Sequence, residues 1–292
     1  MKGSENINGL KVGFVLEGGY NSTNGKLGQN GGVFGREAMV YVGGDYGTLY
    51  AGRINGLLSD GGSVYMTGGL LSTADNGAYY AKGYNNGMTL VGRYDSTLVY
   101  KSPVLAGFQV GVQASNVDTS DGSSSGDRYF AAAASYKAGN FGAFLGGEYL
   151  NKATALANGV ADLDDAFTIL GGASYNFGVA KGYVSANYFK NYAGKYNGLT
   201  MEDGEGYTVT VSADTPVLGG KLQGFLGYTD GEDKATDNGD FKVYSVGAQY
   251  SYNLAKSTKV YVGAGYAKTD SDAADDTVAE TYKVAGGIVY YF

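Results

Sequence analysis

The sequence of 292 residues contains no cysteine, no histidine, no tryptophan and only two prolines. The absence of cysteine excludes disulfides and thiolate metal sites. Histidine is the commonest general base and transition-metal ligand, so its absence excludes the usual serine-triad hydrolases and His-ligated zinc enzymes. We therefore expect a protein that is not an enzyme and that holds no metal and no cofactor.

Long apolar runs and basic segments are lacking as well. The sequence has no run of about 18 apolar residues, so it predicts no transmembrane helix. Its formal net charge is -7 and it contains no basic stripe. Because nucleic-acid binding requires a basic face that neutralises phosphates, we expect no nucleic-acid partner.

Glycine and aromatic residues are abundant, with 51 Gly, 28 Tyr and 12 Phe. Aromatic residues favour strands, and scarce proline leaves few breaks in a hydrogen-bonded ladder. Segments of roughly ten residues with period-two alternation recur between clusters of Gly, Asn, Asp and Ser. We predict about fourteen strands, at 10–21, 33–44, 47–54, 89–102, 107–116, 127–138, 141–151, 166–177, 180–192, 206–215, 220–230, 240–253, 259–269 and 281–292.

The predicted connections alternate in length. The short turns lie near 43–47, 104–107, 138–140, 177–179 and 255–258, and the long polar loops at 117–126, 152–165, 193–205, 231–239 and 270–280. Short turns on one side and long loops on the other are typical of antiparallel transmembrane β-barrels. The sequence thus predicts an all-β fold of this type, formed as a single domain over residues 1–292.

The two faces of each predicted strand differ in polarity. In the last strand, Val284 lies on the apolar face and Lys283 on the opposite one. In the first predicted strand, Phe14 and Glu17 are separated in the same way. A dry core would not accept unpaired Lys and Glu, whereas a water-filled lumen hydrates both.

Several strings, in their order along the chain, resemble the Gram-negative general porins of the enterobacterial, neisserial and β-proteobacterial type. They are Lys2-Gly3-Ser4-Glu5, Phe34-Gly35-Arg36-Glu37-Ala38, Gly44-Asp45-Tyr46-Gly47-Thr48-Leu49, Arg93-Tyr94-Asp95-Ser96-Thr97, Tyr100-Lys101-Ser102-Pro103 and the terminal Phe292. In that family the Lys-Gly-Ser-Glu string closes the second strand. The resemblance therefore implies a chain that lacks the first strand and most of the second, with about fourteen of the family's sixteen strands present.

The resemblance also implies an inward-folded constriction loop. Residues 55–88 form the longest stretch without a clear strand, and long structureless loops are usually functional. By resemblance this stretch folds into the barrel and narrows the pore. The alternative is an exposed loop with no role in the pore.

Charged residues of the pore constriction follow from the same resemblance. Three arginines, Arg36, Arg53 and Arg93, match those that line one wall of the family's constriction. We expect Arg36 to share its strand face with Ala38 and Val40. The facing carboxylates would be Glu17, Asp60 and Asp75. Opposed charges across a narrow aqueous gap would orient dipolar solutes and set ion selectivity.

The implied function is passive diffusion of small hydrophilic solutes and ions through a bacterial outer-membrane porin. Its expected partners are outer-membrane lipid, lipopolysaccharide and two further copies of the chain in a homotrimer. A substrate-selective channel for sugars or anions is an alternative, and its hint is a set of loop tyrosines, Tyr65, Tyr79, Tyr80 and Tyr84. A surface β-rich adhesin is a further alternative, but it would need a short fixed-length repeat, which the sequence lacks.

Overall fold

The structure is a computed structural model that describes most of the chain. The described ranges are 1–21, 23–28, 31–58, 62–67, 69–71, 90, 92–118, 124–151, 164–196, 199–237, 239–272 and 278–290. Within these ranges, no helix is long and apolar enough to cross a membrane.

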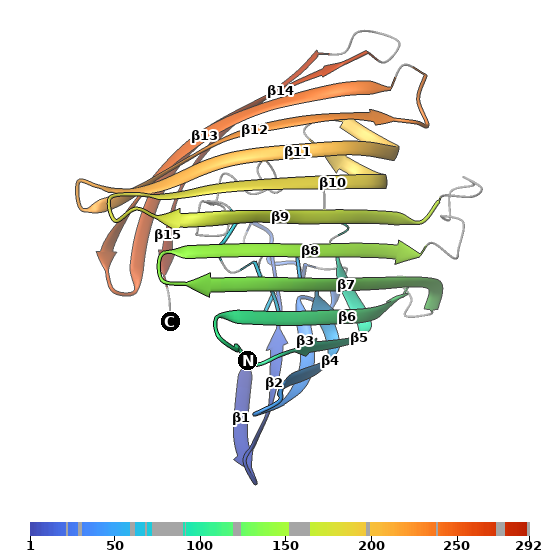
Figure 1. Ribbon diagram of the computed structural model, residues 1–292, viewed down its shortest axis with the longest axis vertical. Helices are drawn as coiled ribbons and strands as arrows, with labels where there is room; N and C mark the ends of the chain where they lie inside the picture. The colour runs from blue at the N-terminus through green and yellow to red at the C-terminus, as the bar shows by residue number, and fades with distance from the viewer. Residues whose placement is uncertain are drawn as a thin grey trace. The chain divides into compact units, whose positions relative to one another are not determined.

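The described residues form one antiparallel sheet whose strands pair in chain order from β1 to β15 (Figure 1). The strands are β1 (Lys2–Ile7), β2 (Leu10–Glu17), β3 (Glu37–Gly44), β4 (Gly47–Asn55), β5 (Arg93–Lys101), β6 (Phe108–Asp118), β7 (Ser124–Ala138), β8 (Phe141–Asn151), β9 (Ala166–Asn176), β10 (Lys181–Tyr196), β11 (Leu199–Val217), β12 (Gly220–Asp233), β13 (Asp240–Ala255), β14 (Thr258–Ser271) and β15 (Val278–Tyr290). This sheet confirms the predicted all-β antiparallel fold.

The chain divides into two compact units, which are described separately below. Unit 1 comprises residues 1–67, 90–136 and 146–167, and unit 2 comprises 68–89, 137–145 and 168–292. That residues 1–292 form a single domain stays a prediction.

Each of the fourteen predicted segments overlaps a strand, and one further strand, β1, precedes them. β1 pairs with β2 through a two-residue turn at Asn8 and Gly9, with φ of 50° and 86°. Asn-Gly is the sequence that best tolerates two positive φ angles in such a turn. β1 contains the Lys-Gly-Ser-Glu string, so this part of the family's second strand is present.

The predicted long loop at 193–205 is wrong. β10 runs to Tyr196 and β11 starts at Leu199, so most of this stretch belongs to a long hairpin. The prediction failed because this stretch is polar and glycine-containing, and its alternation is interrupted by register shifts between Phe189 and Gly194. Beyond the apolar band, strands of a membrane barrel no longer carry the lipid-facing signal.

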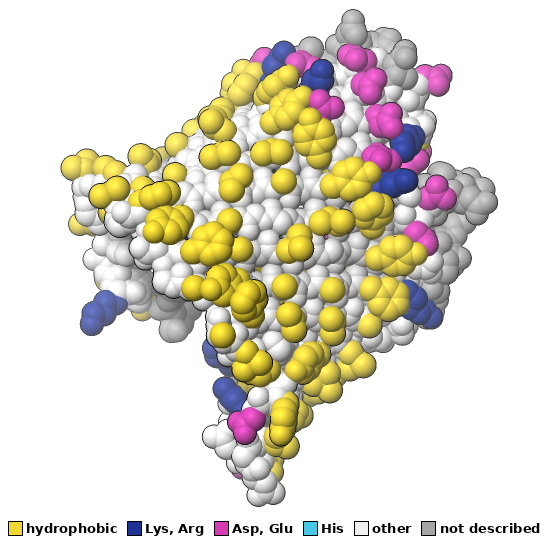
Figure 2. Space-filling view, viewed as in Figure 1, with side chains coloured by type: hydrophobic (Ala, Val, Ile, Leu, Met, Phe, Trp, Pro, Cys, Tyr) yellow, Lys and Arg dark blue, Asp and Glu magenta, His cyan; other side chains and the backbone are white. Residues whose placement is uncertain are grey.

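Polarity is inverted relative to a soluble protein. On β13 of unit 2, Ser245, Gln249 and Ser251 are buried, whereas Tyr244 and Val246 are 46% and 43% exposed. The same alternation holds on the neighbouring strands, with Thr208, Thr210, Ser212, Gln223 and Thr229 buried and Val209, Val211, Leu222 and Leu226 exposed. Figure 2 shows the hydrophobic side chains spread over the outer face of these strands. We call the polar face the inner face.

Candidate pore lining

A charged cluster of unit 1 forms where β2, β3, β4 and β5 end or begin. β2 ends and β3 begins with a cross-strand pair of acids, Glu17 and Glu37. The backbone N–H of Arg36 donates to the carbonyl of Glu17 at 3.0 Å, just before β3 starts. We call Glu17, Arg36, Glu37, Arg53, Arg93 and Asp95 the charged cluster.

Arg36 forms an ion pair with Glu17 through its Nε atom. The prediction that Arg36 shares a strand face with Ala38 and Val40 was wrong. Val40 is 59% exposed and Met39 is 3% exposed, so the face of Ala38 and Val40 points outward, whereas Arg36 pairs with Glu17. Arg36 reaches Glu17 because it lies at the bend before β3, where alternation does not fix the direction of a side chain.

Arg53, at the end of β4, joins two parts of the cluster. Its Nη1 atom donates to Asp95 Oδ1 at 2.8 Å and its Nε atom donates to the carbonyl of Gly35 at 2.8 Å. The preceding residue, Gly52, has φ of 136°, and a Cβ there would lie 2.8 Å from the Cα of Met39. Glycine at this position therefore lets β4 pass close to β3 and bring Arg53 to Asp95.

Arg93 starts β5 and lies within reach of the charges of Arg36, Arg53, Glu17 and Glu37. Its Nε atom is buried and has no hydrogen-bond partner among the described residues. A third guanidinium thus adjoins two arginine–carboxylate pairs.

The described part of the predicted constriction loop in unit 1 lies against the inner face of the sheet. Leu57, Val64 and Met66 are buried, at 0%, 0% and 4% exposure. The wall provides space for them: a Cβ on Gly111 of β6 would overlap Met66 Sδ and lie 3.5 Å from a methyl of Leu57. An inward-folded loop, as predicted, therefore packs its apolar side chains against a glycine of the wall.

Two wall residues also bind the loop by hydrogen bonds. The side-chain oxygen of Gln113 accepts from the backbone N–H of Leu57 at 3.0 Å. The carboxylate of Glu37 accepts from the backbone N–H of Ser63 at 2.8 Å and from its hydroxyl at 2.5 Å. Glu37 is 1% exposed, so its carboxylate holds the loop and does not face the aqueous space.

The returning end of the loop is held by a buried acid of β8. Glu148 is 3% exposed, and its two oxygens accept from the backbone N–H of Leu90 at 2.8 Å and from the hydroxyl of Tyr129 at 2.7 Å. The ring of Tyr129 stacks on Tyr94 at 4.3 Å, and the Tyr94 hydroxyl donates to the carbonyl of Leu90 at 2.5 Å. These four residues fasten the loop immediately before β5.

In unit 2, residues 69–71 also pack against the inner face of the strands. The carbonyl of Gly69 accepts from Lys181 Nζ at 2.7 Å. A Cβ on Gly142 would overlap Leu70, and one on Gly172 would lie 2.8 Å from Leu71. Leu70 and Leu71 are 2% and 0% exposed, so they too pack against glycines of the wall.

Four lysines of unit 2 lie at the short-turn ends of successive hairpins, on the inner face. They are Lys137, Lys181, Lys221 and Lys259, and we call them the lysine row. The charges of Asp214, Lys259 and Lys181 all act on Lys221. A pocket of about 290 Å³ is lined by Lys181, Lys221 and the buried Asp214, and a second of about 220 Å³ by Lys137 and Lys181.

The structure thus brings together four of the six predicted constriction residues, Arg36, Arg53, Arg93 and Glu17. Asp60 and Asp75 lie outside the described residues. The prediction missed Glu37, Asp95, Gln113 and Glu148. Alternation could have placed Glu37 on the inner face, opposite Ala38, but nothing in the sequence reveals that Glu148 binds Leu90, because 58 residues separate them.

An antiparallel sheet that is apolar outside and polar inside, with a loop packed on the inner face, defines a transmembrane β-barrel channel. The sequence matches the Gram-negative porin family over residues 1–272. The chain belongs to this family. It is accordingly a porin of the bacterial outer membrane, forming a water-filled channel for passive diffusion of small hydrophilic solutes.

Individual relatives agree with this assignment. The chain is 28% identical over 327 residues to an outer-membrane porin of Bordetella pertussis, covering 100% of this chain and 81% of that protein. It is similar to the structure of an anion-selective porin from Comamonas acidovorans, at 25% identity and a TM-score of 0.68, covering 100% of this chain and 88% of that one. The structure of OmpF from Salmonella typhi shares the fold, with a TM-score of 0.72 at 14% identity and coverage of 99% and 88%.

Proposed function

We propose that this porin is a general diffusion channel that prefers anions. The observation that carries the proposal is the burial of three carboxylates of the inner face, while two lysines of the same face stay accessible. The carboxylates of Glu37, Glu148 and Asp214 are 1%, 3% and 5% exposed, whereas Lys181 and Lys221 remain partly exposed. These three carboxylates are withdrawn from solutes in the lumen, whereas the two lysines are not, and charged linings of this kind set ion selectivity.

The charged cluster supports the same preference. The exposed acids of the cluster, Glu17 and Asp95, each pair with an arginine, and Arg93 adds a third guanidinium. The similar porin from Comamonas acidovorans is described as anion-selective. We assign the pore constriction in unit 1 to this cluster and to the loop packed beside it. We assign no catalytic role to these residues.

The test is the reversal potential of the reconstituted channel across a KCl gradient. For the unmodified protein, the reversal potential is expected to lie toward the Nernst potential of chloride. In Arg93→Glu, it is expected to shift toward the Nernst potential of potassium. The matched control is Lys242→Glu, because Lys242 is exposed on the outer face of β13 and should leave selectivity unchanged. Reversal of the unmodified channel on the potassium side would refute the anion preference.

The other partners stay predictions. Association with lipopolysaccharide and assembly into a homotrimer are implied by the family resemblance, and the mass of the detergent-solubilised protein would test the trimer. The sugar-selective alternative depends on loop tyrosines, of which Tyr79, Tyr80 and Tyr84 lie outside the described residues. A surface adhesin is not supported, since the chain belongs to a channel family.

A further inference from the structure

The β10–β11 hairpin of unit 2 changes direction near its end. Asn191 has φ of 52°, and the pairing of β10 with β11 shifts register between Phe189 and Tyr192 and again before Gly194. Such bulges bend a strand and increase its local twist. We call the described residues 191–196 and 199–204 the hairpin tip.

The hairpin tip folds back onto the inner face of its own unit. The hydroxyl of Tyr196 lies 3.1 Å from Thr229 Oγ1 on β12, and Thr229 Oγ1 lies 2.9 Å from Thr208 Oγ1 on β11. Tyr196 and Met201 are 7% and 3% exposed, although they belong to the end of a hairpin. An outstretched tip would leave both side chains in solvent.

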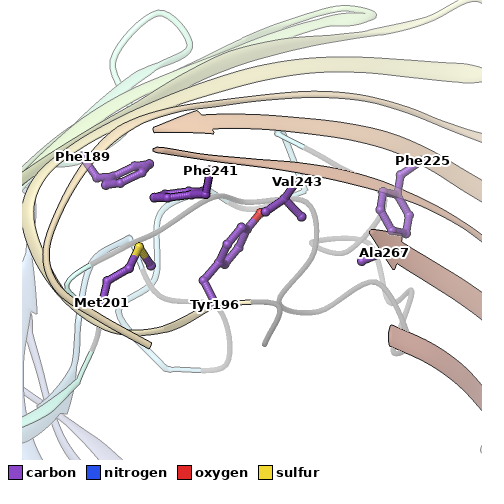
Figure 3. Close-up of a cluster of buried hydrophobic side chains, with 7 residues drawn as sticks. All are labelled: Phe189, Tyr196, Met201, Phe225, Phe241, Val243 and Ala267. Atoms are coloured by element: carbon purple, nitrogen blue, oxygen red, sulfur yellow. The ribbon is translucent and has the colours of Figure 1, made fainter. Parts of the chain in front are cut away.

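Under the tip lies an apolar cluster on an otherwise polar wall. Its members are Phe189, Phe225, Phe241, Val243 and Ala267 from the wall and Tyr196 and Met201 from the tip. Figure 3 shows Tyr196 and Met201 facing Phe189, Phe241 and Val243. Burial of apolar area contributes about 25 cal/mol per Å², so these wall side chains favour the folded-in tip over one that leaves them to lumenal water.

Polar contacts fix the base of the tip. The carboxylate of Asp233, at the end of β12, accepts from the backbone N–H of Asp203 at 2.9 Å. The carbonyl of Asp203 accepts from the backbone N–H of Lys234 at 3.0 Å. Lys234 also forms an ion pair with Glu205. The tip is therefore held by hydrogen bonds at its base and by apolar packing farther out.

We propose that the hairpin tip is a second pore-narrowing element, a size filter on the inner face of unit 2. It is built from different residues than the loop between β4 and β5, and its packing on the wall uses the side chains of Tyr196 and Met201. The filter limits the size of the solutes that permeate the channel. It leaves the selectivity between anions and cations unchanged. This proposal rests on the assignment as a channel but is independent of the anion preference.

The test removes the two packing side chains. In Tyr196→Ala/Met201→Ala, we expect single-channel conductance to rise roughly 1.5- to 2-fold and larger neutral sugars to enter proteoliposomes faster, because pore diameter controls passage. The reversal potential in a KCl gradient should not move. The control is Tyr207→Ala, which removes a tyrosine from the same hairpin whose side chain is 45% exposed on the outer face. A folded double variant with unchanged conductance and unchanged sugar entry would overturn the proposal.

A second measurement applies if the double variant does not fold. Because the chain contains no cysteine, Met201→Cys introduces a single labelling site. With the tip folded in, that thiol should react slowly with a charged, membrane-impermeant reagent, and Tyr196→Phe in the same background should accelerate the reaction. Fast labelling of Met201→Cys alone would show that the tip does not cover the wall. A wild-type protein that does not conduct would contradict the channel assignment itself, whereas an unchanged size limit in a conducting channel contradicts only the filter.

Discussion

Glu148 accepts a hydrogen bond from the backbone N–H of Leu90 at 2.8 Å, across 58 residues of sequence. The bond joins the middle of the sheet to the returning end of the long loop. The other carboxylate oxygen of Glu148 accepts a hydrogen bond from the hydroxyl of Tyr129, so both oxygens have a partner. Glu148 thus acts as an anchor for the loop and is not available to solutes.

Removal of this anchor should free the loop while leaving the barrel intact. Glu148→Ala leaves two buried donors without an acceptor, at a cost of about 1–3 kcal/mol each. We expect a noisier open-channel current and faster proteolytic cleavage within residues 56–90. Tyr149→Phe is the control, since the neighbouring Tyr149 is exposed and bonds Asp165 outside this network. A quiet, protease-resistant Glu148→Ala channel would show that the loop is held by other contacts.

Two glycines should respond differently to alanine. A Cβ on Gly52 meets the backbone of Ala38 and Met39, and φ there is 136°, so Gly52→Ala should destabilise the fold by about 1–3 kcal/mol or more. A Cβ on Gly111 meets first the sulfur of Met66, which can move aside, so Gly111→Ala should cost less. Urea titrations of folding into lipid vesicles would compare the two, and equal losses would contradict this account.

The inverted polarity predicts the effect of exchanging two neighbours on β15. Val284 is 82% exposed on the outer face, and Lys283 lies on the inner face. The exchange Lys283→Val/Val284→Lys keeps the composition but moves a charge into lipid, at a cost of up to about 2–4 kcal/mol near the bilayer centre. The single variant Lys283→Val should fold normally. Stability is read from the unheated gel mobility after urea treatment, and an exchanged variant as stable as the parent would mean that Val284 does not face lipid.

The turn between β11 and β12 offers a stabilising substitution. Leu218 and Gly219 have φ of 48° and 77°, and Leu218 is 90% exposed. Leucine in the left-handed region costs roughly 1–2 kcal/mol, whereas asparagine tolerates it better. Leu218→Asn should therefore raise the urea midpoint. The Asn8-Gly9 turn of this chain has φ angles in the same region. A lowered midpoint would show that the Leu218 side chain makes a contact that outweighs the strain.

Strand alternation was predictable because each residue responds to its own surroundings, lipid or water. Val284 and Lys283 were assigned correctly from this pattern alone, and so were Phe14 and Glu17. Where the backbone departs from the regular pleat, alternation no longer determines the direction of a side chain. Arg36 precedes the first residue of β3. Extending the alternation of β3 to Arg36 therefore placed its side chain on the wrong face.

Contacts between distant segments were not predictable in the same way. The bonds from Glu37 to Ser63 and from Glu148 to Leu90 depend on how a loop folds back, and a single sequence carries no periodic signal for that. The inward turn of the β10–β11 hairpin depends on a bulge near Asn191. The stretch predicted as a loop at 193–205 holds the end of β10 and the start of β11.

The central claim is that alternate side chains of this sheet face lipid and water, so that the folded protein conducts ions. The most direct measurement is the current across a planar bilayer after addition of the purified, folded protein in KCl. We expect stepwise, ohmic conductance that reverses on the chloride side under a salt gradient. A protein that shows the compact mobility of a folded barrel on unheated gels, yet inserts without any conductance, would contradict the account.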